Sequence, residues 1–195
     1  MNQSLVILAS ASPRRAELLG QIGVTFEQRP SDVDESHHID ESPEVYVQRL
    51  ATAKAEVALA KCNDCVVIGS DTVVTLGGVV LGKPIDEQDH ADVFAQLSGR
   101  THDVLTAVTV MNGKRSEQVL SRSSVTFAEV SAADIARYWR TGEPADKAGG
   151  YAIQGMAALF ITHLTGSYSG VMGLPVRETA TLLAQFGVIP WLNKE

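Results

Sequence analysis

The turn formed by residues 10–15 (SASPRR) combines residue types that bind phosphate well. Ser12 is a good N-cap and Pro13 suits the first helical position, so a helix is predicted to begin here. The N-terminus of such a helix offers free backbone N–H groups and the positive end of the helix dipole. Ser10 and the two arginines add further donors. The turn therefore predicts a phosphate site, although arginines paired with nearby acids on an ordinary capped helix would also explain it.

The two arginines of this turn differ in helical phase. At about 100° per residue, Arg15 falls on the same side as Leu18, Leu19 and Ile22, which form the apolar stripe of the helix. Arg14 falls to one side of that stripe. We therefore expect Arg15 to point inward, where it could contact a bound phosphate.

A second helix, expected over residues 43–61, carries a lysine on its apolar face. Lys54 lies at the centre of the stripe formed by Val47, Leu50, Ala51, Val57 and Ala58. A lysine on an inward face needs a carboxylate, an anionic ligand or a route to water. Lys54 is thus a second candidate for binding an anion, and an ion-paired or snorkelling lysine is the alternative.

Two acidic residues complete the candidate set. Asp71 follows the buried run 66–69, and we expect it where that strand ends, the usual place for ligands in α/β sheets. A carboxylate there can bind a metal, act as a general base or simply cap a turn. Thr72 adds a hydroxyl, and Lys83 lies just beyond a predicted hairpin. Glu35 belongs to an acidic loop whose charges could be merely solvated.

These residues together suit a nucleoside triphosphate with a divalent cation. Cations neutralise the phosphates, acids hold the metal, and one acid activates water. The cations are Arg14, Arg15, Lys54 and Lys83, and the acids are Glu35 and Asp71. Three common alternatives are missing from the sequence: a G-x-x-x-x-G-K-[ST] loop, a G-x-G-x-x-G turn after a strand, and a G-x-S-x-G nucleophile elbow.

Strand and helix signals alternate along the chain, which favours an α/β fold. Strands are expected over residues 5–9, 24–27, 66–69, 73–76, 79–81, 101–111, 115–127 and 159–164. Helices are expected over residues 13–22, 43–61, 87–97, 132–142 and 175–187. Gly77-Gly78 predicts a hairpin, and Asn112-Gly113 predicts a type I′ turn between the two long strands. We expect a single domain with two lobes over residues 1–195.

Composition limits the partners of the chain. Its 195 residues are 45% apolar, which is enough to bury a core. The net charge of −7 disfavours a nucleic-acid binder, which needs a basic surface. No apolar run approaches the roughly 20 residues of a membrane span, and the N-terminus does not read as a signal peptide. We therefore expect a cytoplasmic protein that binds neither nucleic acid nor membrane.

Cys62 and Cys65 are the only cysteines, and their C-x-x-C spacing could form a redox pair or half of a zinc site. A zinc site would need a second ligand pair, for which only His37 and His38 are adjacent in the sequence. A redox pair would normally open a helix, whereas this pair follows one. We expect the cysteines to serve packing.

Four motifs occur in order along the chain: 10–15 (SASPRR), 69–72 (GSDT), 82–84 (GKP) and 152–155 (AIQG). Together they resemble the Maf family of nucleoside triphosphate pyrophosphatases over nearly the whole chain. The resemblance implies a Maf/ITPase-like α/β fold, with a central mixed sheet flanked by helices and two lobes with a cleft between them. It also implies metal-dependent release of pyrophosphate and a nucleoside monophosphate. Family members are described as clearing surplus or non-standard nucleotides and as linked to restraint of cell division, and many are homodimers.

Three positions distinguish subgroups of this family. The subgroup that acts on 7-methyl-GTP tends to have tryptophan after the Ser-Pro, glutamine after the catalytic aspartate and glutamate in the last glycine motif. This chain has Arg14, Thr72 and Gln154 at those places, so it resembles the subgroup that hydrolyses dTTP and UTP. A glutamine amide both donates and accepts, so Gln154 could read the carbonyl and imide edge of a pyrimidine.

The resemblance and the residue types together assign roles. Asp71 is expected to activate water for attack on the α-phosphorus, and Glu35 with Asp71 is expected to hold Mg²⁺, Mn²⁺ or Co²⁺. Phosphate binding falls to Ser10, Arg15, Lys54 and Lys83.

Three rival functions stay open at this point. The first is a pyrophosphatase with another base preference, such as inosine triphosphate, a modified pyrimidine nucleotide or 7-methyl-GTP. The second is a nucleotide sensor that regulates division without turnover, and the third is a nucleic-acid-binding module, which the acidic charge disfavours.

Overall fold

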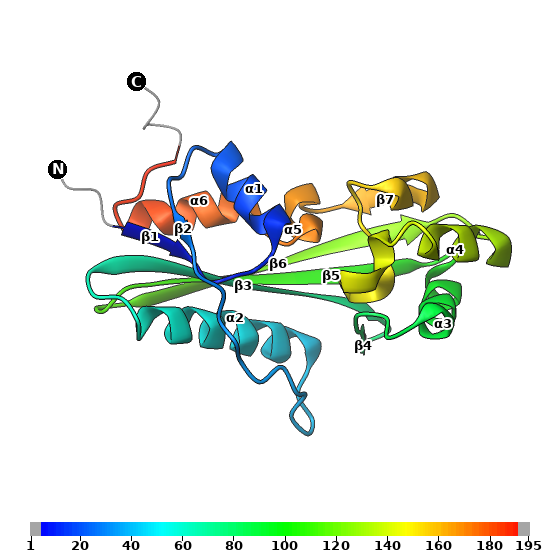
Figure 1. Ribbon diagram of the computed structural model, residues 1–195, viewed down its shortest axis with the longest axis horizontal. Coiled ribbons are helices and arrows are strands. Elements are labelled where there is room, and N and C mark those ends of the chain that lie inside the picture. Colours follow the sequence, from blue (N-terminus) through cyan, green and yellow to red (C-terminus); the bar gives the residue numbers. More distant parts are fainter. Residues whose placement is uncertain (1–4, 191–195) are drawn as a thin grey trace.

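Seven strands form one mixed sheet in the computed structural model, which describes residues 5–190 (Figure 1). The strands are β1 (Leu5–Leu8), β2 (Glu27–Gln28), β3 (Cys65–Leu76), β4 (Val79–Leu81), β5 (Thr101–Met111), β6 (Ser116–Phe127) and β7 (Ile161–Thr165). Their order is β2-β1-β3-β5-β6-β7, with β4 added to β3. β1 runs parallel to β2 and β3, and all other pairs are antiparallel.

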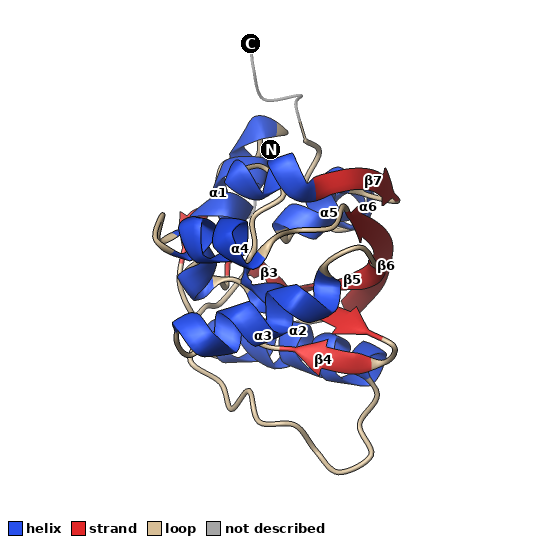
Figure 2. Cartoon of the chain, turned by 90° about the vertical axis from the view of Figure 1, so that its right-hand side faces the viewer, coloured by secondary structure: helices blue, strands red, loops and turns tan. Residues whose placement is uncertain are grey.

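Helices cover both faces of the sheet. They are α1 (Pro13–Gln21), α2 (Pro43–Leu59), α3 (Glu87–Leu97), α4 (Ala132–Trp139), α5 (Tyr168–Met172) and α6 (Val176–Gln185). Three 3₁₀ turns follow α4: η1 (Glu143–Asp146), η2 (Ala148–Gly150) and η3 (Met156–Phe160). In Figure 1, α2 lies against one face and α1, α5 and α6 lie against the other, while α3 and α4 gather at the far end of the long strands. Figure 2 shows the long loop before α2 reaching beyond the helical layer. The predicted α/β fold with a mixed sheet is confirmed.

The buried core has one large cluster and two smaller ones. The large cluster joins α1, α3, α4 and α6 to the sheet through side chains such as Leu19, Phe94, Tyr138 and Leu183. The two smaller clusters lie under α2. The site described below therefore rests on elements that are packed on both faces of the sheet.

The expectation that Asp71 follows the end of a strand is wrong. β3 is continuous from Cys65 to Leu76, and β5 pairs with it residue by residue from Val67 to Thr75. Asp71 lies in the middle of this ladder, opposite Ala107. Polar residues do not end a strand whose backbone groups are bonded to a neighbour, and β5 supplies that neighbour.

The opposite edge of β3 explains why Asp71, although buried, lies beside an opening in the sheet. β1 pairs with β3 up to Ile68, and β4 pairs with it only from Val74 onward. Among the described strands, none pairs with residues 69–73 on that edge. Asp71 lies at the centre of this gap, where the sheet also changes from parallel to antiparallel pairing. Ligands in α/β sheets bind beyond the ends of parallel strands, and the end of β1 provides such an opening.

Gly69 allows α2 to approach the sheet closely. A Cβ at this position would lie 2.1 Å from the carbonyl oxygen of Ala51 and 2.8 Å from the backbone nitrogen of Ala55. Because side chains alternate along a strand, Asp71 faces the same side as Gly69. The close packing therefore brings Lys54, which lies between Ala51 and Ala55, next to Asp71.

The two predicted turns had different outcomes. The Gly77-Gly78 hairpin is confirmed, since both glycines have positive φ, at 59° and 84°. The type I′ turn at Asn112-Gly113 is wrong, because four residues (112–115) connect β5 to β6 and neither Asn112 nor Gly113 has positive φ. The Asn112 side chain instead accepts hydrogen bonds from two backbone N–H groups that follow it, and so closes a longer turn.

Candidate active site

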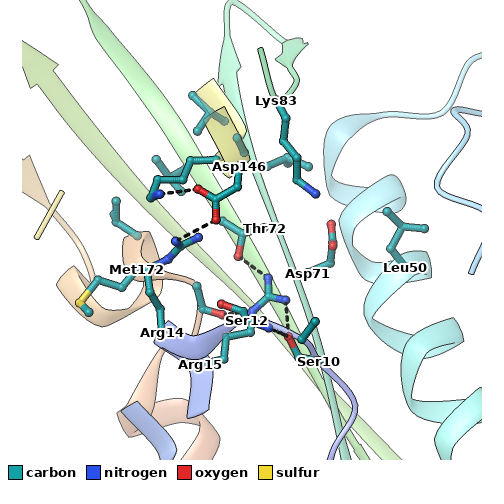
Figure 3. A pocket seen from close by; sticks show the side chains of 18 of the residues that line it. Ser10, Ser12, Arg14, Arg15, Leu50, Asp71, Thr72, Lys83, Asp146 and Met172 are labelled. Atoms are coloured by element: carbon teal, nitrogen blue, oxygen red, sulfur yellow. Dashed lines mark hydrogen bonds and ion pairs between the residues drawn. The ribbon is translucent and has the colours of Figure 1, made fainter. Parts of the chain in front are cut away.

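A cleft of about 550 Å³ opens beside β3 where β1 ends. All nine residues singled out from the sequence line it: Ser10, Arg14, Arg15, Glu35, Lys54, Asp71, Thr72, Lys83 and Gln154. They come from six separate segments of the chain, so the fold brings together what the sequence keeps apart. The volume falls within the range of pockets that bind small molecules. Figure 3 shows Asp71 and Lys83 directed into the same open space, with Arg15 across from them.

Consecutive residues of β3 face opposite layers of the fold. Asp71 points toward α2, whereas Ser70 and Thr72 point toward α1 and the segment after α5. The hydroxyl of Ser70 donates to the carbonyl oxygen of Gly173 at 3.0 Å. β3 thus presents a carboxylate to one side of the cleft and hydroxyls to the other.

Arg15 is held firmly at the start of α1. Its Nε donates to the Gly173 carbonyl at 2.9 Å, Nη1 to Ser10 Oγ at 3.1 Å and Nη2 to Thr72 Oγ1 at 3.2 Å. A guanidinium carries five N–H groups, so two are left for a ligand by the contacts within residues 5–190. Burial lowers the pKa of Arg15, and the nearby Asp71 carboxylate opposes that effect. The inward direction expected from helical phase is confirmed.

The N-terminus of α1 offers further donors beside Arg15. Ser12 occupies the N-cap position as predicted, but its side chain makes no capping bond within the described part of the chain. Its backbone N–H instead donates to Ser10 Oγ at 3.2 Å. The N–H groups of the first turn have no partner inside the helix. The Ser12 hydroxyl and the first-turn N–H groups of α1 are therefore placed to bind an anion.

Arg14 lies at the edge of the cleft, in keeping with its helical phase. Its Nη1 is 3.9 Å from Asp146 Oδ2, and its side chain is about one quarter exposed. Asp146 and the following Lys147 line the cleft as well, although the sequence did not single them out. The only sequence signal for them was their place in the polar, glycine-rich stretch before Gln154.

Lys54 bridges the two acids of the candidate set. Its Nζ lies 2.6 Å from Glu35 Oε1 and 2.7 Å from Asp71 Oδ1. The side chain is nearly buried, as expected from the apolar stripe of α2. Of the explanations for an inward lysine, the ion pair with carboxylates is the one realised in this structure. Lys54 thereby fixes the position of one oxygen of Asp71.

Several side-chain bonds tie the loop that carries Glu35 to α2, and two of them lie beside the cleft. The Tyr46 hydroxyl donates to the Glu35 carbonyl at 2.8 Å, and the Ser31 hydroxyl donates to the Lys54 carbonyl at 2.8 Å. Burial is the largest single influence and raises the pKa of Glu35, but the hydrogen bond from Lys54 and the positive charges of Lys54, Lys83 and Arg15 together outweigh it, so the pKa is lowered. Sequence reasoning missed Tyr46. Its spacing of four residues from Leu50 was the signal that it shares the inward face of α2.

The donor set of the cleft fits a cation that is shared with phosphate. Among the described residues, no three His, Cys, Asp or Glu side chains gather into a complete protein metal site. Mg²⁺ does not need one, because it commonly keeps several waters and binds through one or two carboxylates plus substrate phosphates. Glu35 and Asp71, both within reach of Lys54, supply two such carboxylates.

The charge of the cleft is opposite to that of the whole chain. Its lining includes five cations, Arg14, Arg15, Lys54, Lys83 and Lys147, and three carboxylates, Glu35, Asp71 and Asp146. The whole chain carries a net charge of −7. A positive pocket in an acidic protein favours a small anion over a polyanionic surface such as nucleic acid.

A network of hydrogen bonds fixes the segment that carries Gln154. The Tyr138 hydroxyl donates to Glu143 Oε1 at 2.6 Å and accepts the backbone N–H of Ala152 at 3.1 Å. Glu143 Oε2 accepts the backbone N–H of Met156 at 3.1 Å. Bonds therefore hold the chain on both sides of Gln154, whose own side chain is exposed on the cleft. Sequence reasoning missed Glu143, which carried no motif signal.

Residues 5–186 match the family described as Maf-like protein. This chain belongs to the Maf family. Three relatives named dTTP/UTP pyrophosphatase support the assignment. The protein of Xanthomonas euvesicatoria is 51% identical over 94% of this chain and 99% of its own. That of Shewanella denitrificans is 50% identical over 91% and 94%, and that of Pseudoalteromonas atlantica is 47% identical over 94% and 98%.

A solved structure shares the fold of this Maf protein at low sequence identity. The HAM1 protein from Coxiella burnetii superposes with a TM-score of 0.53 and 14% identity, over 94% of this chain and all of that chain. This similarity concerns the fold alone.

The two cysteines of this Maf protein lie outside the cleft. Both are free thiols. Burial, followed by the bond to Cys62, raises the pKa of Cys65 to about 12, so its thiol stays protonated at neutral pH. That is consistent with a packing role.

None of the described helices has both the length and the apolar character of a membrane span.

Proposed function

We propose that this Maf protein hydrolyses dTTP and UTP to the nucleoside monophosphate and pyrophosphate, as a house-cleaning enzyme of nucleotide metabolism. One observation carries the proposal: the cationic start of α1 and the Lys54-bridged carboxylates face each other across the gap in β3. The names of the relatives support the substrate class. A triphosphate needs this pairing of phosphate donors with an acid that can activate water.

Asp71 is the general base of this proposal. It orients a water molecule and takes its proton as the water oxygen bonds to the α-phosphorus. The bond from that phosphorus to the bridging oxygen breaks, and pyrophosphate leaves. Lys54 Nζ, at 2.7 Å from Asp71 Oδ1, fixes one carboxylate oxygen and leaves the other for the water. General-base catalysis of this kind contributes about 10²–10⁴ in rate.

In this proposal the phosphates are bound by the start of α1, which lies across the cleft from Asp71, and by Lys83. Arg15 presents two N–H groups in a planar fork, a geometry that suits phosphate oxygens. The N-terminus of α1 and the Ser12 hydroxyl lie beside it. Lys83 reaches into the cleft near Asp71 and acts as a point charge (Figure 3). Ser10 orients the guanidinium of Arg15, because its Oγ accepts a hydrogen bond from Arg15 Nη1.

Glu35 and Asp71 would hold a divalent cation, with Mg²⁺, Mn²⁺ and Co²⁺ all suited to oxygen ligands. When bound with the triphosphate, such an ion neutralises phosphate charge and stabilises the pyrophosphate leaving group. Lys54 already contacts both carboxylates, so it sets their separation before the nucleotide arrives.

Base selection is assigned to Arg14, Thr72 and Gln154, which all line the cleft. The exposed amide of Gln154 can donate to a carbonyl and accept from an imide N–H, both of which uracil and thymine present. Arg14 belongs to the turn at the start of α1, and its ion pair with Asp146 connects this turn to the stretch of chain that precedes Gln154.

A nucleotide panel tests this proposal. Purified protein should release pyrophosphate from dTTP and UTP far faster than from GTP, inosine triphosphate or 7-methyl-GTP, with Mg²⁺, Mn²⁺ or Co²⁺ added separately. A preference for 7-methyl-GTP would refute the base assignment. Nucleotide binding without pyrophosphate release under any of the three metals would refute the enzyme and favour a sensor.

A further inference from the structure

A line of buried hydroxyl groups runs from Arg15 into the core. Arg15 Nη2 contacts Thr72 Oγ1 at 3.2 Å, Thr72 Oγ1 lies 3.0 Å from Thr106 Oγ1, and Thr106 Oγ1 lies 2.8 Å from the carbonyl oxygen of Gly170. Thr72 and Thr106 sit directly opposite each other on β3 and β5. Thr106 is 1% exposed, so bulk water cannot exchange for its partners.

The end of this line fixes the direction of every hydrogen bond in it. A carbonyl oxygen only accepts, so Thr106 must donate its single hydroxyl hydrogen to Gly170. Thr72 must then donate its own hydrogen to Thr106. The guanidinium of Arg15 only donates, so it takes one of the two lone pairs of Thr72 Oγ1. Only the second lone pair of Thr72 Oγ1 is then left for a ligand in the cleft, so this hydroxyl can accept a hydrogen bond but not donate one.

The Gly170 carbonyl is a fixed anchor for this line. It also accepts the backbone N–H of Gly173 at 2.9 Å. The N–H of Gly170 donates to Ser167 Oγ at 2.9 Å, which caps α5. The peptide group that carries this carbonyl also donates the Val171 N–H to the Ser167 carbonyl at 3.0 Å, so the carbonyl cannot turn away without breaking that bond.

We propose that Thr106 is a positioning residue for base selection, because it makes Thr72 an acceptor-only hydroxyl on the cleft wall. An acceptor facing an anionic phosphate oxygen would be repelled, so the lone pair of Thr72 suits an N–H of the base. Uracil and thymine carry such a hydrogen at N3, whereas cytosine has a bare acceptor nitrogen there. The inference rests on the proposed dTTP and UTP hydrolysis and names the residue behind its discrimination against cytosine.

Thr106→Val tests the proposal, since valine keeps the shape of threonine and removes the hydroxyl. The Thr72 hydrogen is then free to turn toward the cleft, where it can donate to cytosine N3. We expect the ratio of kcat/KM for UTP over CTP to fall about threefold to tenfold, the worth of one neutral hydrogen bond. Thr106→Ser restores the hydroxyl and should restore the ratio.

Thr109→Val is the matched control. Thr109 is equally buried on β5, but its hydroxyl contacts Thr52 and Gln118 on the side of α2. It should leave the UTP/CTP ratio unchanged even if the thermal midpoint falls. A ratio that shifts as much in Thr109→Val as in Thr106→Val would overturn the proposal, because the effect would then be one of general packing.

A double-mutant cycle with Thr72→Val separates direct from indirect action. If Thr106 acts through Thr72, the change in ratio for the double variant should equal that for Thr72→Val alone. Additive changes would contradict the proposal. The ratio should also be measured as equilibrium affinities for UTP and CTP without added metal. If the wild type fails to hydrolyse UTP, the proposed function falls, and these affinities still decide the role of Thr106: an unchanged affinity ratio in Thr106→Val overturns it.

Discussion

Replacing Asp71 with asparagine should lower kcat for pyrophosphate release from UTP by about 10²–10⁴-fold, with little change in KM. Asparagine keeps the shape of aspartate and can still contact Lys54, but its amide cannot take a proton from water. The loss should therefore fall on the chemical step rather than on binding. Stopped-time assays of pyrophosphate release on the folded variant measure this directly.

Asp103→Asn provides the matched control for Asp71→Asn. Asp103 is an aspartate on the neighbouring strand β5 that pairs with Arg122 at 3.0 Å and does not line the cleft. Its kcat should stay close to that of the wild type. Near-normal turnover of folded Asp71→Asn would mean that another group activates the water.

The second large effect is expected at Arg15. Arg15→Ala should lower kcat/KM by about 10- to 100-fold, because a charge-assisted hydrogen bond to phosphate is lost and each tenfold in rate corresponds to 1.36 kcal/mol. Affinity for inorganic pyrophosphate, measured by calorimetry, should fall in parallel. Both readouts follow from the two N–H groups that Arg15 has left for a ligand.

Arg15 also contacts Ser10, Thr72 and Gly173, so its loss could change the structure of this side of the cleft as well as remove the phosphate contact. Arg15→Lys retains the charge but not the planar fork, and it should recover only part of the lost affinity. Arg14→Ala, one residue earlier, should alter the preference among nucleotides more than the affinity for pyrophosphate. Unchanged kcat/KM in folded Arg15→Ala would exclude contact with the phosphates.

Helical phase was the most informative local signal in the sequence. It predicted that Arg15 and Lys54 point inward while Arg14 lies aside, and the contacts of all three agree. The reason is that phase depends only on the helix itself. Four consecutive residues define which side faces the core, whatever the rest of the chain does.

Features that depend on distant partners were not predictable in this way. The continuity of β3 through Asp71 requires β5, which begins 30 residues later in the chain. The anchor of Gln154 requires Tyr138 and Glu143, whose roles appear only once α4 and η1 fold together. The hydroxyl line through Thr106 joins four segments, α1, β3, β5 and α5. None of these residues shows its role in local spacing.

Asp71 shows how the right residue can follow from an incorrect strand boundary. The sequence suggested a ligand position because a buried run appeared to stop before it. The physical cause is instead the end of β1, which leaves the edge of β3 open from residue 69 to 73 among the described strands. Ligands bind beyond the ends of parallel strands, and the parallel strand that ends at this site is β1, not β3.

The central claim is that water attacks the α-phosphorus of the nucleotide and that pyrophosphate is the leaving group. Hydrolysis of UTP in ¹⁸O-enriched water tests it most directly, with mass spectrometry of both products after one turnover. Attack at the α-phosphorus predicts one ¹⁸O atom in uridine monophosphate and none in pyrophosphate. Label in pyrophosphate, or release of inorganic phosphate with a nucleoside diphosphate, would contradict the account.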